Sequence, residues 1–168
     1  MPFQLSNHNV DNSQRRKYTP SEFGPEDLLF RGCCLDDFVD RKAVRENLNA
    51  NAIRFPNFSC NWGRFSTPES VKTRAGGRET DGCFAFTVAV ARFREMATPC
   101  HDPYPAGDPE NYAHVEVRQL RPNEGVYYEP EKERKKLKSA ADGWSHSEKL
   151  RYREHVAENI DVLIAPTA

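Results

Sequence analysis

A strict two-residue alternation between positions 84 and 91 constrains the fold of this 168-residue chain more than any other feature. Its bulky members are Phe84, Phe86, Val88 and Val90, and alanine or threonine stands at every position between them. This is the period of a β-strand, in which successive side chains point to opposite faces. We therefore predict a central strand over residues 84–91, with its bulky face in the core and a helix close against its small face.

Short apolar runs predict further strands. They cover residues 28–30, 53–55, 113–120 and 162–164. The first of these strands should end at Gly32, and Pro56 confines the second to a sheet edge. We expect an α+β fold, with a mixed or antiparallel sheet of four to five strands and about three flanking helices.

The helices are predicted from apolar spacing and from capping patterns. Apolar residues at helical spacing predict a helix over residues 36–47. The Ser66–Glu69 segment is a capping box with an early proline, so that a helix should begin there and end at Gly76-Gly77. A second capping box at Ser145 predicts a helix that reaches Asn159, and the mixed charges of residues 131–136 suit a solvated helix.

The length suits one domain. Residues 1–24 lack apolar periodicity and are predicted to form a flexible N-terminal arm, and residues 25–168 a single α+β domain. Prolines recur between positions 99 and 109, which predicts a surface loop over residues 98–111.

Composition limits the partners that we expect. Lysine and arginine number 24 against 25 aspartates and glutamates, so that the net charge offers no attraction to nucleic acid or to an anionic membrane. The longest weakly polar run, residues 83–91, is about half of the roughly 20 residues that span a bilayer. No secretion signal begins the sequence and the five cysteines are an odd number, so that we expect a cytoplasmic protein with reduced thiols and a protein partner.

One face of the strand at residues 113–120 carries the polar row His114, Glu116 and Arg118. A proton shuttle, a carboxylate and a cation at this spacing are close enough to act together, as in an active site. The same row also suits a solvent-facing strand of an antiparallel sheet. The sequence leaves both interpretations open.

A second candidate site joins Arg31-Gly32, at the end of the first strand, to the helix start that contains Arg64, Ser66, Thr67 and Glu69. Free amides at a helix N-terminus bind anions, and guanidinium groups would strengthen a phosphate or carboxylate site. The capping box alone also explains Ser66 and Glu69.

These residues bear a partial resemblance to a known enzyme family. An Arg-Gly that closes an early strand, a Phe-Ser-Thr segment and a Glu on a later strand resemble the Arg, Ser, Glu pattern of ADP-ribosyltransferases. In that family the three residues grip NAD and polarise its glycosidic bond, which implies such roles for Arg31, Ser66 and Glu116. The family carries a second Glu or Gln two residues before the catalytic Glu, where this chain has His114.

A broader resemblance is to small bacterial proteins with a Ser-x-Asn-x-x-x-[Tyr/Phe]-Ser-x-Pro-Glu segment and a Tyr-x-His-x-Glu strand. The first segment is matched by Ser59, Asn61, Phe65, Ser66, Pro68 and Glu69, and the second by Tyr112, His114 and Glu116. The resemblance implies a bacterial module in which the two segments belong together, without implying an activity.

Metal sites are not predicted. No Cys-x-x-Cys or His-x-x-x-His pair is present, so that buried free thiols are expected instead of a structural zinc site. A magnesium-dependent nuclease with Asp81 and Glu116 would lack its usual lysine.

Two hypotheses of function therefore remain. The first is a non-catalytic interaction or accessory module that binds a protein partner through the proline-rich loop and the charged C-terminal helices. The alternative is an NAD-handling enzyme, which requires Arg31, Ser66, His114 and Glu116 to converge in a single cleft.

Overall fold

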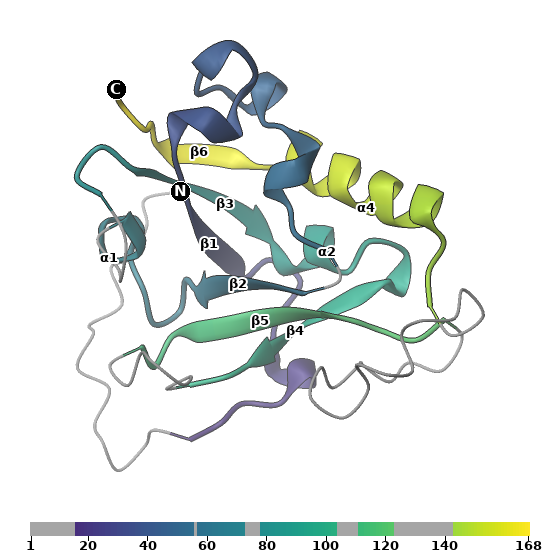
Figure 1. Ribbon diagram of the computed structural model, residues 1–168. Helices are drawn as coiled ribbons and strands as arrows, with labels where there is room; N and C mark the ends of the chain where they lie inside the picture. Colours follow the sequence, from purple (N-terminus) through teal and green to yellow (C-terminus); the bar gives the residue numbers. More distant parts are fainter. Residues whose placement is uncertain (1–15, 56, 73–77, 104–110, 123–142) are drawn as a thin grey trace.

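A computed structural model describes residues 16–55, 57–72, 78–103, 111–122 and 143–168 of the chain. Its centre is one antiparallel sheet with the strand order β4-β5-β2-β1-β3-β6 (Figure 1). The strands are β1 (Leu28–Cys33), β2 (Asn57–Trp62), β3 (Gly82–Thr87), β4 (Ala97–His101), β5 (His114–Gln119) and β6 (Asp161–Ile164). The α+β class with an antiparallel sheet is confirmed, but the sheet has six strands instead of the predicted four to five.

Two strands were missed and one was wrongly predicted. Residues 53–55 form no strand, whereas β2 lies just after them and uses the alternation of Phe58, Cys60 and Trp62 with polar residues. Strand β4 lies in the segment whose prolines predict a loop. Pro99 is tolerated there because β4 is an edge strand, which bonds to a neighbour on one side only.

The central strand is also shorter than predicted. Strand β3 ends at Thr87, and residues 88–91 form the short helix α2 (Val88–Ala91), because the Thr87 side chain accepts a hydrogen bond from the Val90 N–H and caps a helical turn. The predicted helix over residues 36–47 is wrong as well. The chain instead makes separate 3₁₀ turns, among them η5 (Arg45–Asn47), and Asp40 and Arg41 have positive φ angles that interrupt a helix.

One face of the sheet, the core face, builds the main hydrophobic core. Leu29, Trp62, Phe84 and Val115 are among its strand residues and are buried. The helix α4 (His146–Glu158) covers this face together with α2 and residues 38–55, and it contributes Tyr152 and Val156. The predicted helix after Ser145 is thereby confirmed, with the Ser145 side chain accepting from the Glu148 N–H.

The opposite face, which we call the polar face, is covered in part by the helix α1 (Pro68–Lys72). Val71 of α1 packs on a small cluster formed by Phe30, Cys83 and Ala85. A helix therefore does lie against the small side chains of the central strand, at β1 and β3 and away from α4 (Figure 1). Strands β2 and β5 lie beyond this cluster and present polar residues.

Part of the predicted N-terminal arm packs on the sheet. Phe23 is buried and stacks on Trp62 with ring centroids 3.9 Å apart, and the Tyr18 N–H donates to Nδ1 of His101. Arg92 donates to the Phe23 and Pro20 carbonyls. The packed region therefore begins before Pro25, where the composition predicts its start.

Of the described helices, none is both long and apolar enough to cross a membrane.

Gly82→Ala is expected to destabilise the fold. A Cβ at this position would collide with the Ile164 carbonyl oxygen and lie 2.6 Å from the Pro166 nitrogen, both of which are backbone atoms. We expect a loss of about 1–3 kcal/mol in the free energy of unfolding, measured by chemical denaturation. Gly32→Ala is the matched control because its Cβ would have no neighbour closer than 3.9 Å. Equal losses in the two variants would contradict the prediction.

Candidate functional site

The candidate site begins where β1 and β2 separate. These strands pair only at Leu29 with Trp62 and at Phe30 with Asn61, and the ladder does not continue to Gly32. The Ser59 carbonyl therefore has no ladder partner on β1, and NH1 of Arg31 donates to it over 2.6 Å. Because a backbone carbonyl needs a donor, the guanidinium group takes the place of the missing strand pairing.

A hollow of about 260 Å³ lies at this separation. It is lined by β1, β2, β5 and α1 through the residues Phe30, Arg31, Gly32, Ser59, Cys60, Asn61, Val71, Asn111 and His114. Nδ2 of Asn111 donates to Oδ1 of Asn61 over 2.9 Å and ties the segment before β5 to β2. The hollow is slightly smaller than most ligand pockets, which measure about 300–1,000 Å³, and suits one end of a ligand.

Beside the hollow, a hydrogen-bonded chain crosses the polar face. Ser59 lies opposite Glu116, and Asn61 opposite His114, in the β2–β5 register. The Ser59 hydroxyl donates to Oε1 of Glu116 over 2.6 Å, and Nε2 of His114 lies 3.1 Å from the same oxygen. Glu116 is therefore held from both sides.

The other side of the His114 ring faces Asp102, which follows β4. Nδ1 of His114 lies 2.9 Å from the Asp102 carbonyl oxygen and 3.6 Å from its Oδ2. We assign a proton to Nδ1 because a carbonyl oxygen can only accept. The Asp102 N–H also donates to the His114 carbonyl, which joins the ends of β4 and β5.

These contacts shift both titrating groups of the pair. Burial lowers the pKa of His114, but the bond to Glu116 and the Asp102 carbonyl outweigh it and leave this pKa above its usual 6.5. Burial raises the pKa of Glu116, but His114 and the Ser59 hydroxyl outweigh it and leave this pKa below its usual 4.5. Both shifts favour the pair of an ionised Glu116 and a cationic His114.

The structure brings together three of the four residues predicted to be catalytic. Arg31 and His114 line the hollow, and Glu116 joins them through Ser59. Ser66 is not among the lining residues. Its buried hydroxyl lies 3.0 Å from the Ser70 hydroxyl at the start of α1.

The four residues predicted to bind a ligand, Arg64, Thr67, Glu69 and Arg118, lie outside the hollow. Thr67 caps α1, with Oγ1 accepting from the Ser70 N–H, and Glu69 is exposed in the first turn. The guanidinium group of Arg64 lies over the aromatic rings of Tyr18, Trp62 and Phe65. Arg118 lies on the polar face of β5, two residues beyond Glu116 and opposite Thr98 of β4. None of the four lines the hollow.

Sequence reasoning did not assign Ser59, Asn61, Asn111 or Asp102 to the site, although Ser59 and Asn61 belong to the segment that resembles small bacterial proteins. The available signal was the alternation of Phe58, Cys60 and Trp62 with polar residues, which predicts a strand with Ser59 and Asn61 on one face. Asp102 and Asn111 flank the proline-rich segment, where no periodicity indicates which side chains turn toward the sheet.

The cysteines are all free, and four of the five are buried. Burial raises the pKa of the Cys60 and Cys83 thiols to about 12, and that of Cys100 to about 11. Thiols of this kind are protonated and unreactive at neutral pH.

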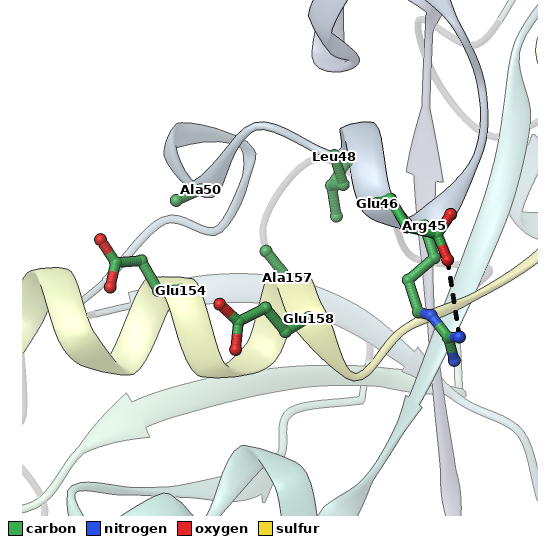
Figure 2. A pocket seen from close by; sticks show the side chains of 7 residues that line it. All are labelled: Arg45, Glu46, Leu48, Ala50, Glu154, Ala157 and Glu158. Atoms are coloured by element: carbon green, nitrogen blue, oxygen red, sulfur yellow. Dashed lines mark ion pairs between the residues drawn. The ribbon is translucent and has the colours of Figure 1, made fainter.

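A second hollow of about 240 Å³ lies between α4 and the 3₁₀ turns on the core-face side (Figure 2). Its apolar wall is formed by Leu48, Ala50 and Ala157. Glu154 and Glu158 come from α4, and Arg45 pairs with Glu46 over 3.6 Å. The hollow is therefore acidic with one internal ion pair.

No protein-family model, curated protein or solved structure matches the chain.

Glu116→Gln is expected to lower the pKa of His114, because the variant removes the charge that offsets burial. The raised pKa of His114 adds to the free energy of unfolding. This contribution is complete below pH 6.5 and is lost as the pH rises through the pKa of His114 in the folded protein. The lowered pKa of Glu116 also adds to the free energy of unfolding. This contribution is present above pH 4.5 and is lost as the pH falls through the pKa of Glu116 in the folded protein.

An NMR titration of the imidazole resonances measures this pKa directly. His155, which stacks on Phe93 in another part of the structure, is the internal reference and should not change. A His114 pKa that is the same in both proteins would rule out the described pair.

Proposed function

We propose that the chain is an NAD-cleaving enzyme in which Arg31, Ser59 and Glu116 form the Arg, Ser, Glu set typical of ADP-ribosyltransferases. The proposal is supported by one observation, the hydrogen-bonded chain from Arg31 through Ser59 to Glu116 across β1, β2 and β5. It assigns to Ser59 the role that the sequence resemblance gives to Ser66.

The chemistry of NAD suits a site with one carboxylate. The nicotinamide ring of NAD is cationic, so that it leaves as a neutral molecule with the electrons of the glycosidic bond and needs no general acid. The ribose carbon then develops oxocarbenium character, which a nearby carboxylate stabilises. Glu116 is suited to this role because Ser59 and His114 hold it in its ionised form.

Arg31 is suited to bind the diphosphate. A guanidinium group has five N–H donors, and its bond to the Ser59 carbonyl uses one of them. Guanidinium groups bind phosphate oxygens with paired hydrogen bonds. Arg31 lines the hollow beside Gly32, which has no side chain of its own.

The acceptor in this proposal is water or another small nucleophile. Transfer to a protein side chain uses the second Glu or Gln of the family, and His114 stands in that place. Both nitrogens of His114 already face oxygens of Asp102 and Glu116, so that the ring is not available to take a proton from an acceptor. With water as the acceptor, the expected products are nicotinamide, ADP-ribose and one proton, which passes to solvent.

The proposal predicts that the purified protein releases nicotinamide from NAD. Glu116→Gln should lower the rate about 10²–10³-fold, the usual loss when one stabilising group of a developing charge is removed. Ser59→Ala should lower it about tenfold or more, because the variant removes a hydrogen bond to a charged group.

Ser66→Ala is the control that separates the two serines. This variant should release nicotinamide at the wild-type rate, because Ser66 contacts Ser70 of α1 and does not line the hollow. A loss with Ser66→Ala but not with Ser59→Ala would contradict the assignment. No nicotinamide release by the wild-type protein would refute the activity.

A second candidate function, the binding of a protein partner, is favoured by exposed apolar side chains. Val39 and Val44 precede the 3₁₀ turn η5 and are 53% and 48% exposed, and Leu150 of α4 is 40% exposed. The acidic hollow in Figure 2 lies beside η5 and α4, so that a partner with basic and apolar residues would fit this surface. The predicted contacts were the proline-rich loop over residues 98–111 and the charged C-terminal helices. Residues 104–110 of that loop and the predicted helix over residues 131–136 lie outside the described residues.

Val44→Asp is expected to weaken such a complex without changing the rate of NAD cleavage. The change places a charge where an apolar contact is needed, on the side of the sheet away from Glu116. Co-purification from the native cell, compared with Glu69→Gln in α1 on the polar face, measures the effect. Equal recovery of the same partner with both variants would exclude this surface.

A further inference from the structure

Asp102, His114 and Glu116 form a cluster of metal-ligand type on the polar face. Each offers one ligand atom, and the three atoms all lie within 4.8 Å of one another. Among the described residues, no other group of three or more His, Cys, Asp or Glu side chains has its ligand atoms this close together. The cluster combines one imidazole and two carboxylates, a set that binds transition-metal ions in proteins.

We propose that Asp102, His114 and Glu116 bind a divalent transition-metal ion, Zn²⁺ or Mn²⁺, and that this ion inhibits the site by occupying Glu116. The inhibition rests on the proposed function, whereas the binding does not. A tetrahedral ion with bonds of about 2.1 Å holds its ligand atoms about 3.4 Å apart. The three ligand atoms, which lie within 4.8 Å of one another, therefore approach one another by up to about 1.4 Å when the ion binds.

The surroundings of the His114 ring suit a cation. Three oxygens face it, namely the Asp102 carbonyl, the Asp102 carboxylate and Glu116. None of the three can donate a hydrogen bond when the carboxylates are ionised. Without an ion, the cationic His114 ring offsets their negative charge. A bound ion takes over this role once Nε2 has released its proton to solvent.

The backbone contacts preorganise the ligands. The Asp102 carbonyl accepts from Nδ1 and orients the ring with Nε2 toward Glu116, which is the outer-shell arrangement common at metal-bound histidines. The bond between the Asp102 N–H and the His114 carbonyl fixes the two residues relative to each other. Ser59 supports the Glu116 carboxylate.

An ion can also reach the cluster from solvent. The Asp102 and Glu116 side chains are 36% and 22% exposed, whereas the His114 side chain is 10% exposed. The imidazole therefore forms the base of the site and the carboxylates its rim. The remaining coordination positions would be filled by water.

Titration of the full-length protein with Mn²⁺, followed by electron paramagnetic resonance, tests the binding. Mn²⁺ is the suitable probe because it prefers oxygen and nitrogen ligands to thiolates, so that the five cysteines do not interfere. We expect one bound Mn²⁺ with a ¹⁴N coupling in pulsed spectra, which a site without histidine would not give. No bound Mn²⁺, or bound Mn²⁺ without this coupling, would overturn the proposal.

Variants then identify the ligands. Asp102→Asn, His114→Gln and Glu116→Gln should each weaken binding about tenfold or more, and His114→Gln should also remove the ¹⁴N coupling. Asp161→Asn, on the opposite edge strand, is the matched control and should bind as the wild type does. Circular dichroism verifies that each variant is folded. Unchanged affinity in all three folded variants would overturn the assignment.

Inhibition is measured separately, as the rate of nicotinamide release with and without Zn²⁺ or Mn²⁺. The proposal predicts a lower rate at saturating metal, and EDTA should restore it. If the protein binds Mn²⁺ with the ¹⁴N coupling but never cleaves NAD, the proposed function fails and the metal site stands. If it cleaves NAD at a rate that bound metal does not change, the inhibitory role fails.

Discussion

The early separation of β1 from β2 determines where chemistry can occur on this fold. An antiparallel pair that continued past Phe30 and Asn61 would consume the Ser59 carbonyl in the ladder and leave no hollow. The strands instead part, and the Arg31 side chain satisfies the carbonyl. The guanidinium group of Arg31 can donate to this carbonyl and still keep further N–H donors for a ligand. A backbone N–H has only one donor and could not do both.

The second constraint is charge compensation on the polar face. Glu116 and His114 are both partly or largely buried, and each would be costly alone because burial disfavours its charged form. Their mutual contact, with Ser59 and Asp102 at the two ends, reverses both shifts. The result is an ionised carboxylate held beside the hollow. Such a pair is weak evidence for stability, because its replacement by apolar residues is often neutral.

Local patterns in the sequence predicted the elements whose own residues determine them. The capping box at Ser145 marked the start of α4, and the alternation around Val115 placed His114 and Glu116 on one face of β5. Patterns failed where a distant contact decides the outcome. Pro99 lies in a strand because β4 is an edge, and Ser59 instead of Ser66 meets Glu116 because of the β2–β5 register, which no local signal encodes.

In the two proposals, the same register would make a nucleotide and a metal ion compete. Glu116 is the residue common to two sets of contacts on the polar face. One leads to Ser59, whose carbonyl accepts from Arg31, and the other leads to His114 and Asp102. A ribose approached from the hollow needs this carboxylate free and anionic, whereas an ion among the three ligands withdraws its charge. Both uses depend on the single Ser59–Glu116 pairing between β2 and β5, so that shifting it by one residue would turn Glu116 toward the core and remove the two sites together.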